Sequence, residues 1–202
     1  MTTVHLTHYI YTASPDSPPP HPTRLLVVDY DHTLVAPKED RRFPKDVDDW
    51  RWYRPNVPDV VRHHIERGYL LVIVTNQSKM WKHTQIRTVV DELSEALAEP
   101  TPIITLVATD RAYHKPDRRA FDTLLAFLGV SSKEWPSIAQ RSIFVGDALG
   151  RAADWSDTDR LFAERIGITD IRAPEVFFAT SDTVKSAPRL SPRVGPELVI
   201  MV

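Results

Sequence analysis

The chain has 202 residues, 42% of them hydrophobic, which suits a single domain with one ordinary core. Its formal net charge of −2 excludes a global attraction for nucleic acid or anionic membranes, so an anionic partner must be held by a local basic patch. The absence of cysteine excludes a disulfide framework and thiolate metal sites, and it favours an intracellular location.

Proline-rich segments flank the expected core. The stretch ASPDSPPPHPTR is typical of a polyproline-like spacer, so we expect residues 1–23 to form an extension and residues 24–178 to form the domain. The tail at residues 179–202 contains the similar stretch SAPRLSPRVGPE, and its structure is left open. No apolar stretch reaches the roughly 18 residues that a membrane helix needs, and MTTVHLTHYI lacks the layout of a secretion signal. A soluble chain without a membrane partner is therefore expected.

Four short apolar runs predict the strands of the core. They are LLVVDY from Leu25, YLLVIVT from Tyr69, PIITLVAT from Pro102 and SIFVGD from Ser142. Their almost continuous Val, Ile and Leu content is typical of strands that are covered on both faces.

Amphipathic segments between these runs predict helices. The segment after Asn56 carries apolar residues at helical spacing, has Pro58 in its first turn and ends at Gly68. Residues 85–98 and 117–128 each show one apolar stripe. The alternation of strands and helices predicts an α/β fold, a three-layer Rossmann-like parallel sheet sandwiched by helices.

Polar residues follow each predicted strand, where ligands bind in open α/β sheets. They are Asp29, Asp31 and Thr33 after the first strand, Thr75 and Asn76 after the second, Asp110 after the third, and Gly146 and Asp147 after the fourth. Acids that converge in a small volume need a cation, and an all-oxygen cluster suits Mg²⁺.

This set of residues predicts phosphate chemistry. A carboxylate beside a bound cation can attack phosphorus and form an aspartyl-phosphate, and we expect Asp29 to be this nucleophile. Asp31 would protonate the leaving oxygen and then activate water. Thr75 and the amides of VTNQS, at the positive end of the next helix, would hold phosphate oxygens, and Lys115 would offset charge. Thr75 and Asn76 could instead cap that helix.

The motifs resemble those of the haloacid dehalogenase (HAD) phosphatase superfamily. DYDHT fits the DxDxT motif, VTN the second motif, HKP the lysine motif and VGDALG the acidic metal motif, in the required order. The resemblance implies that Asp29 and Asp147 bind Mg²⁺ by their side chains and Asp31 by its main-chain carbonyl. We assign Thr33 and Asn76 to substrate binding. His32 stands where most members have glycine.

Longer segments resemble polynucleotide 3′-phosphatases, the phosphatase half of polynucleotide kinase-phosphatases. They are FPKDVDDWRWYRPNVP, GYLLVIVTNQS, LVATDRAYHKPD and SIFVGDALGRAADWSDTDRLFAERIGI, within residues 25–178. Arg151 matches the arginine after the last motif, and Trp50 the tryptophan before the first long helix. The resemblance implies removal of 3′-phosphates from DNA ends in strand-break repair, with a nuclear location in a eukaryote. No GxxxxGK[ST] loop occurs, so the kinase half is missing, and the phosphatase would act alone or beside a separate 5′-kinase or ligase. A monomer is expected.

The spacing of the motifs leaves no room for a cap domain. Only 42 residues separate Thr33 from Thr75 and 40 separate Thr75 from Lys115, and each gap already contains a crossover helix. Without a cap the site is open to polymers. We expect Trp81 to stack on an unpaired terminal base. The cations expected to contact the DNA backbone around the mouth are Lys79, Lys82, Arg111, Arg118 and Arg151.

Other polar and aromatic residues receive structural interpretations. Asp154, Asp157 and Asp159 are interpreted as a solvated, helix-capping face rather than a second metal site. Arg41 and Arg42 are interpreted as part of a solvated loop. Packing roles are favoured for His63, His64, Trp50, Trp52 and Tyr53, while His32 and His114 flank the expected site.

Two other functions stay open. A capless phosphatase for histidinol phosphate or heptose bisphosphate is disfavoured because the usual cysteine and histidine zinc loop is absent. A catalytically inactive scaffold that binds DNA ends or repair proteins is disfavoured by the intact set of four motifs.

Overall fold

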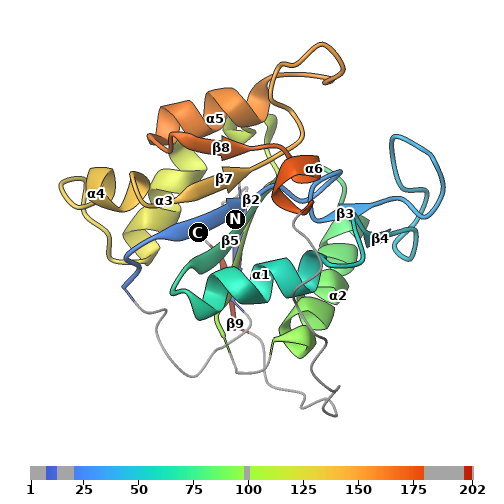
Figure 1. Cartoon of the computed structure of the whole chain (residues 1–202), viewed down its shortest axis with the longest axis horizontal. Coiled ribbons are helices and arrows are strands. Elements are labelled where there is room, and N and C mark those ends of the chain that lie inside the picture. Colours follow the sequence, from blue (N-terminus) through green and yellow to red (C-terminus); the bar gives the residue numbers. More distant parts are fainter. Residues whose placement is uncertain (1–7, 13–20, 98–100, 180–197, 202) are drawn as a thin grey trace, which may run out of the picture.

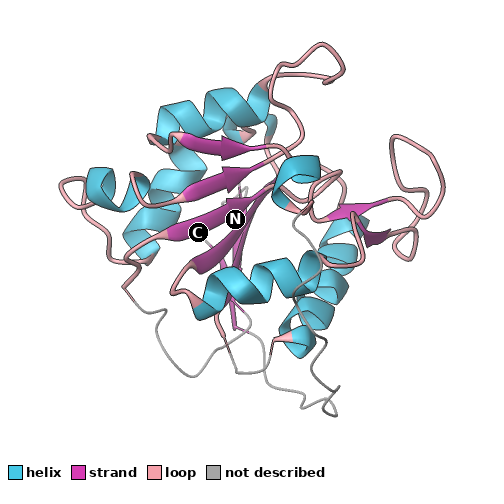
Figure 2. Ribbon diagram, in the orientation of Figure 1, coloured by secondary structure: helices cyan, strands magenta, loops and turns pink. Residues whose placement is uncertain are grey.

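The computed structural model describes residues 8–12, 21–97, 101–179 and 198–201. Its core is a seven-stranded sheet between two layers of helices (Figure 1, Figure 2). Among the described residues, every helix is too short or too polar to cross a bilayer. The predicted α/β sandwich is therefore confirmed.

The four predicted strands form the centre of the sheet. They are β2 (Leu25–Val28), β5 (Leu70–Asn76), β6 (Ile103–Ala108) and β7 (Ile143–Val145), paired in parallel in the order β7-β2-β5-β6. Their apolar side chains are buried on both faces, which explains the nearly unbroken Val, Ile and Leu runs.

Successive side chains of each strand enter opposite cores. In β2, Leu25 and Val27 join one cluster of buried residues, while Leu26 and Val28 join the other. The first face is covered by α3 (Arg119–Phe127), α4 (Trp135–Ala139) and α5 (Thr158–Ile166). The second face is covered by α1 (Val57–Glu66), α2 (Trp81–Ala96) and α6 (Pro174–Phe177).

Three of these helices were predicted from apolar stripes. The stripe of α1 follows Asn56, with Pro58 in the first turn, and the stripe of α3 buries Phe121 and Leu124. Helix α2 begins at Trp81, four residues before the predicted start at residue 85. The prediction missed this first turn because Lys82, His83 and Thr84 are polar and do not extend the apolar stripe.

Some short strands carried no recognisable sequence signal. β8 (Asp170–Arg172) extends the parallel sheet beside β7 and has half-buried side chains rather than an apolar run. β3 (Val35–Ala36) and β4 (Arg51–Trp52) pair antiparallel as a hairpin of two-residue strands, and Trp50 packs edge to face on Trp52 with ring centres 5.3 Å apart. The expected packing role of this tryptophan pair agrees with the structure.

The chain termini differ from expectation. β1 (His8–Thr12) pairs antiparallel with β6, and β9 (Leu198–Met201) pairs antiparallel with β1. The expectation that everything before residue 24 lies outside the core is wrong for this strand, which adds to the sheet edge through main-chain pairing. The proline-rich residues 13–20 and the tail at 180–197 lie outside the described residues. The division at residues 24 and 178 stays a prediction.

The connections on either side of β5 hold only a few small secondary-structure elements. The described chain places the β3–β4 hairpin and α1 between β2 and β5, and α2 between β5 and β6. Within the described ranges no cap domain is inserted at either position.

Packing of the first face depends on an aromatic cluster. Phe121 lies 5.3 Å from Trp135 and 5.8 Å from Phe162, ring centre to ring centre, and is fully buried. We expect Phe121→Ala to lower the free energy of unfolding by about 3–5 kcal/mol because it removes a large buried side chain. Urea denaturation would measure this loss. Val176→Ala, at a side chain that is 63% exposed, is the control and should change little. An unchanged midpoint for Phe121→Ala would contradict this packing.

Candidate active site

The polar residues predicted at the strand ends meet in one hollow. Asp29 directly follows β2, which is where the strand order reverses, with β5 and β6 on one side and β7 and β8 on the other. The hollow has a volume of about 190 Å³. Its lining consists of Asp29, Asp31, His32, Arg42, Phe43, Thr75, Asn76, Lys115, Asp147, Ala148, Trp155, Ser156, Thr158 and Asp159.

Three carboxylates converge at the base of the hollow. Oxygen atoms of Asp29, Asp147 and Asp159 all lie within 4.8 Å of one another. Asp29 is 7% exposed and Asp159 only 2%, so the cluster is largely removed from water. Burying like charges this close is costly unless cations compensate them.

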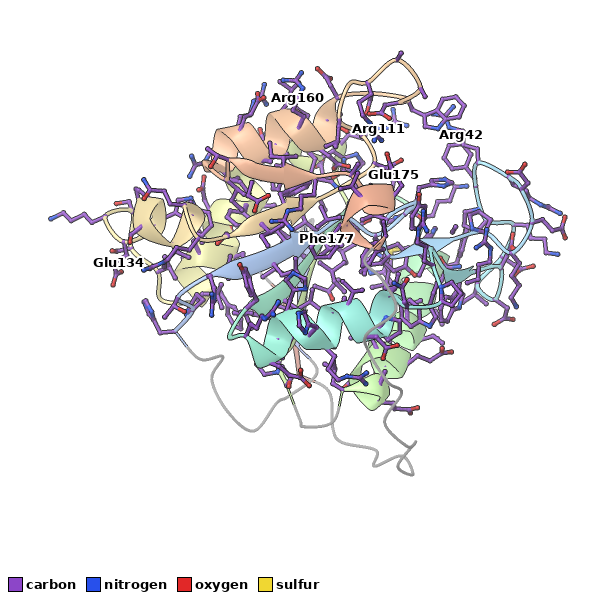
Figure 3. The ribbon with its side chains drawn as sticks, viewed as in Figure 1. Arg42, Arg111, Glu134, Arg160, Glu175 and Phe177 are labelled. Carbon is purple, nitrogen blue, oxygen red and sulfur yellow. The ribbon has the colours of Figure 1, made fainter. Side chains whose placement is uncertain are left out.

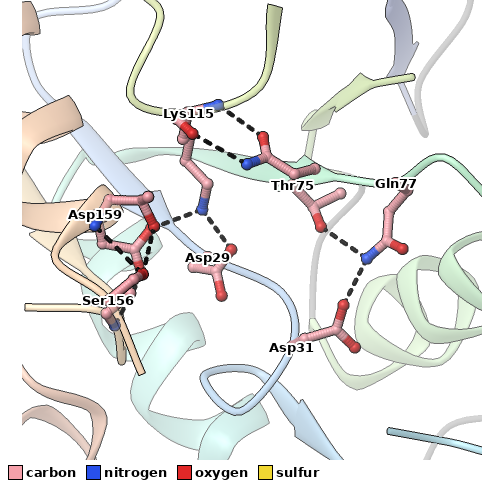
Figure 4. Close-up of polar contacts among 10 residues, drawn as sticks. Asp29, Asp31, Thr75, Gln77, Lys115, Ser156 and Asp159 are labelled. Carbon is pink, nitrogen blue, oxygen red and sulfur yellow. Dashed lines mark hydrogen bonds and ion pairs between the residues drawn. The ribbon is translucent and has the colours of Figure 1, made fainter. Parts of the chain in front are cut away.

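Lys115 supplies part of this compensation. Its Nζ donates to Asp29 Oδ1 and, at 2.7 Å, to Asp159 Oδ1 (Figure 4). Burial lowers the pKa of Lys115, but the charges of Asp159 and Asp29 outweigh burial and hold the pKa above its usual value. The lysine is therefore a permanent cation inside the acidic cluster.

One ammonium does not fully offset three acids. Burial raises the pKa of Asp29 well above its ordinary value, and Asp159 and Asp147 raise it further against the opposing charge of Lys115. Burial and then the charge of Asp159 raise the pKa of Asp147 to about 6. These shifts mean that the ionised cluster would be stabilised by another cation, and all-carboxylate donors favour a hard one.

The main chain of Lys115 is fixed by Asn76. The side-chain amide of Asn76 accepts from the Lys115 backbone N–H at 2.8 Å and donates to the Lys115 carbonyl at 3.3 Å. Asn76 ends β5, so this pairing ties the loop after β6 to the neighbouring strand. Asn76 also lines the hollow, and its expected contact with substrate stays a prediction.

Gly146, the glycine of the VGD motif, lies where a larger residue would clash with Asp159. A Cβ on Gly146 would lie 2.4 Å from Asp159 Oδ2 and 2.7 Å from its Cγ. No side chain fits between β7 and α5 at this point, and the missing Cβ lets Asp159 reach Lys115.

Asp159 was therefore misinterpreted as solvated. It is buried in the first turn of α5, and its Oδ2 accepts from the Ala148 N–H at 3.1 Å. A signal was available, because Asp159 shares the apolar stripe of α5 with Phe162, Ala163 and Ile166. Asp157 stands at the N-cap of α5 but makes no side-chain cap hydrogen bond, and it pairs with Arg160 instead.

Asp31 is held apart from this cluster. Its carboxylate accepts from Gln77 Nε2 and, at 2.6 Å, from Lys82 Nζ. Lys82 is 5% exposed and also donates to Gln85 Oε1 at 2.9 Å. The expectation that Lys82 lies at the mouth to meet DNA is therefore wrong in position, because the acid draws it inward. Gln77 and this use of Lys82 had no sequence signal.

The two threonines of the motifs differ in position. Thr75 lines the hollow, and its Oγ1 accepts from Gln77 Nε2 at 3.0 Å, so Gln77 bridges Thr75 and Asp31 (Figure 4). Thr33 is fully buried and is absent from the described lining. A direct substrate contact by Thr33 is not supported by this position. Helix α2 begins at Trp81, so neither Thr75 nor Asn76 caps it.

The mouth is formed by residues other than those expected. Arg42, labelled in Figure 3, and Phe43 belong to the loop at residues 37–50, and Trp155 belongs to the loop after β7. Phe43 is 66% exposed and Trp155 65%. Arg42 is exposed, as expected for a solvated loop, but it also lines the hollow, and its guanidinium lies 3.6 Å from the Trp155 ring centre.

Several predicted DNA contacts lie away from the hollow. Of the described residues, Lys79, Trp81, Arg111, Arg118 and Arg151 do not line it. Arg151 pairs with Asp154 and Glu175, and Arg118 pairs with Asp122. Asp110 caps a short 3₁₀ helix, η1 (Arg111–Tyr113), by accepting from the Ala112 N–H at 2.8 Å. Contacts from these residues to DNA stay predictions.

Two solved structures with a similar architecture are described as phosphatases. A crystal structure described as a HAD-like phosphatase from Mesorhizobium loti has a TM-score of 0.59 and 21% identity, covering 81% of this chain and 78% of that one. A D,D-heptose 1,7-bisphosphate phosphatase from B. bronchiseptica, complexed with magnesium and phosphate, has a TM-score of 0.51 and 19% identity, covering 71% and 76%. The chain has the HAD-like phosphatase fold.

The sequence defines the family within this fold. Residues 24–178 match the family described as Polynucleotide kinase 3 phosphatase, and the chain belongs to it. A bifunctional polynucleotide phosphatase/kinase of Schizosaccharomyces pombe is 32% identical over 161 residues, which are 77% of this chain and 37% of the relative. Polynucleotide 3′-phosphatase ZDP of Arabidopsis thaliana is 28% identical over 155 residues, or 67% of this chain and 22% of the relative.

The length of the relatives varies. The chain spans well under two thirds of both cellular proteins. A 20.8 kDa protein of Autographa californica nuclear polyhedrosis virus is 30% identical over 167 residues, which cover 77% of this chain and 85% of the viral one.

The raised pKa of Asp147 predicts a pH-dependent cost to stability. A carboxyl whose pKa is raised to about 6 on folding stabilises the folded state below its ordinary pKa of 3.8, and that contribution is lost as the pH rises through 6. In EDTA at pH 7.5, Asp147→Asn should therefore raise the free energy of unfolding by about 1–2 kcal/mol. At pH 4 the difference should nearly vanish. Urea denaturation at both pH values would measure it.

The control for this comparison is Asp40→Asn, at an exposed loop residue. It should change stability little at either pH. A wild-type protein that is more stable than Asp147→Asn at pH 7.5 in EDTA would show that the cluster is not under electrostatic strain.

Proposed function

We propose that this protein is a Mg²⁺-dependent phosphatase that removes 3′-phosphate groups from DNA ends through a phosphoenzyme on Asp29. The product would be the 3′-hydroxyl that polymerases and ligases need, so the reaction belongs to strand-break repair. The observation that carries the proposal is the contact of Lys115 with Asp29, beside Asp147 and Asp159, in a chain whose residues 24–178 match the polynucleotide phosphatase family.

The first step uses Asp29 as the nucleophile. An oxygen of its carboxylate forms a bond to phosphorus, and the bond from phosphorus to the 3′-oxygen breaks. Lys115 is placed to offset the charge that develops on the transferring group, because its Nζ already contacts Asp29. The Thr75 hydroxyl lines the same hollow and can donate to a phosphate oxygen.

Asp31 serves in both steps, as acid in the first and as base in the second. Asp31 gives a proton to the leaving 3′-oxygen, and later takes one from the water that attacks phosphorus and releases phosphate from Asp29. In the resting geometry, Gln77 and Lys82 hold its carboxylate on the side of α2. Asp31 must therefore turn from this pair toward the leaving oxygen during the reaction.

The acidic cluster fits a magnesium ion. Asp29, Asp147 and Asp159 offer carboxylate oxygens within 4.8 Å of one another, and the main-chain carbonyl of Asp31 follows two residues after Asp29. When bound, Mg²⁺ would neutralise charge on the transferring phosphoryl group. The raised pKa values of Asp29 and Asp147 support the need for such a cation.

The shape of the mouth supports a polymer end as substrate. The hollow is not covered by an inserted domain within the described ranges, and exposed aromatic side chains, Phe43 and Trp155, stand at its rim. Such rings suit stacking against an unpaired nucleotide base. A partner kinase or ligase, a monomeric state and a nuclear location stay predictions.

An oligonucleotide assay tests the activity. With Mg²⁺, the protein should convert a 3′-phosphorylated DNA oligonucleotide to its 3′-hydroxyl form with a kcat/KM at least about 100-fold above histidinol phosphate or heptose bisphosphate. Asp29→Asn should lower turnover more than about 1,000-fold because it removes the nucleophile, while substrate binding is retained. Asp110→Asn, at the exposed cap of η1, is the matched control and should stay active.

The same assay separates the competing functions. Faster turnover of the small esters would favour a small-molecule phosphatase over the DNA enzyme. Full turnover by Asp29→Asn would refute the phosphoenzyme, and binding of the 3′-phosphorylated end without turnover by the wild type would indicate a scaffold.

Metal removal gives an independent measurement. Mg²⁺ at about 100 times its dissociation constant should stabilise the wild type by about 2.7 kcal/mol and raise its Tm by several degrees, because the folded state binds it selectively. Asp147→Asn should lose most of this shift. Calorimetry in EDTA and in Mg²⁺ would measure both, and equal shifts for the two proteins would place the metal elsewhere.

A further inference from the structure

His32 has an unusual backbone conformation. Its φ is +56°, and among the described residues no other residue except glycine has a positive φ. This left-handed region costs a histidine roughly 1 kcal/mol relative to glycine, so the residue must be held there by its surroundings. The superfamily resemblance expects glycine at this position, which would remove the cost. A histidine here therefore calls for a compensating contact.

The compensating contact is made by the imidazole. His32 Nε2 lies 2.6 Å from the main-chain carbonyl oxygen of Arg42. A carbonyl can only accept, so Nε2 carries the proton and donates it. The bond joins the loop that carries Asp29 and Asp31 to the loop at residues 37–50, ten positions further along the chain.

The base of the 37–50 loop is fixed by other residues. The Asp49 carboxylate accepts from the backbone N–H of Lys38 at 3.0 Å and of Lys45 at 2.9 Å. Gln85 of α2 donates to the carbonyls of residues 46 and 47. These bonds hold the two sides of the loop and leave its tip, at residues 41–43, to be held by contacts across the hollow.

Arg42 makes the tip part of the mouth. Its guanidinium lies 3.6 Å from the ring centre of Trp155 and 5.0 Å from that of Phe43. Stacking on Trp155 keeps the guanidinium at the rim while its N–H groups remain available for an anion. The carbonyl that binds His32 belongs to this same residue, so the bond sets where the arginine stands.

We propose that His32 is a positioning residue that clamps the tip of the 37–50 loop so that Arg42 meets a second phosphate of the substrate, the phosphodiester next to the terminal 3′-phosphate. The inference rests on the proposed function and adds a selectivity for chains over single nucleotides. A terminal phosphate alone, as in thymidine 3′-phosphate or p-nitrophenyl phosphate, would gain nothing from this contact.

Three substitutions of His32 separate the hydrogen bond from the backbone effect. His32→Gly relieves the left-handed backbone and removes the donor. His32→Asn tolerates the same backbone but is too short to reach the Arg42 carbonyl. His32→Gln keeps a donor at about the reach of Nε2 and should rescue. His21→Asn, at an exposed histidine beside Glu134, is the control for the exchange itself.

Steady-state kinetics gives the first readout. We expect His32→Gly and His32→Asn to raise KM for a 3′-phosphorylated oligonucleotide about five- to tenfold while kcat stays within about twofold. Turnover of p-nitrophenyl phosphate and thymidine 3′-phosphate should not change. His32→Gln should stay near the wild type. Arg42→Gln should raise the oligonucleotide KM by a similar factor, because it keeps the clamped carbonyl but loses the cation.

Limited trypsin digestion gives a second readout that needs no substrate. Lys38, Arg41, Arg42 and Lys45 are exposed cleavage sites in the loop. Releasing the tip should speed cleavage there about three- to tenfold in His32→Gly and His32→Asn, but not in His32→Gln or His21→Asn. Peptide mass spectrometry would locate the cuts.

The outcomes are distinguishable. Unchanged trypsin cleavage in His32→Asn overturns the clamp whatever the activity. Faster cleavage with an unchanged oligonucleotide KM, or an Arg42→Gln variant with normal KM, overturns the role of the clamp in substrate binding. A parallel loss with p-nitrophenyl phosphate would instead place His32 in the reaction centre. If the wild-type protein does not dephosphorylate the oligonucleotide, the proposed function is refuted. The trypsin cleavage rates would still show whether His32 holds the loop.

Discussion

The site depends on one buried cation between two buried acids. Lys115 contacts both Asp29 and Asp159, and all three side chains are nearly inaccessible to water. Removing charges from water costs several kcal/mol each, so the lysine and the acids can be buried only together. Asn76 fixes the main chain of Lys115, and the bare backbone of Gly146 makes room for Asp159. The ends of β2 and β5 and the first turn of α5, which are distant in sequence, therefore all contact Lys115.

This constraint explains why the acids differ in their surroundings. Asp29 and Asp147 lie where negative charge accumulates, so the pKa of each is raised, and a bound cation would favour their ionised forms. Asp31 has its own cation, Lys82, and an amide donor, Gln77. Two carboxylates that are two residues apart in the sequence therefore have different partners, which fits the separate roles proposed for Asp29 as nucleophile and Asp31 as proton carrier.

The sheet could be predicted because strands that are buried on both faces have nearly continuous apolar sequences. The runs that became β2, β5, β6 and β7 are continuous in apolar residues, and polar residues at their ends mark the site. The directions in which charged side chains point were harder to predict from the sequence. An acid in the first turn of a helix is usually solvated, so Asp159 was placed outside, although its stripe partners Phe162 and Ile166 point inward. Lys82 was expected at the surface because nothing in the sequence shows that Asp31 reaches it.

Edge elements could not be predicted for a different reason. β8 has three residues and half-buried side chains, and β1 and β9 join the sheet through main-chain hydrogen bonds that any residue can make. The loop at residues 37–50 is likewise shaped by carbonyl and N–H contacts, such as those of Asp49 and His32, rather than by an apolar pattern.

The antiparallel edge also determines where the polypeptide leaves the sheet. His8 pairs with Ala108 and Met201 with Tyr9, so the outer ends of β1 and β9 stand at the carboxyl end of β6, on the same side as the hollow. With neighbouring strands about 4.8 Å apart, β1 lies about 14 Å from β2 across the sheet. Any module fused before β1 or after β9 would therefore emerge on the side of the sheet that carries the hollow rather than behind the domain.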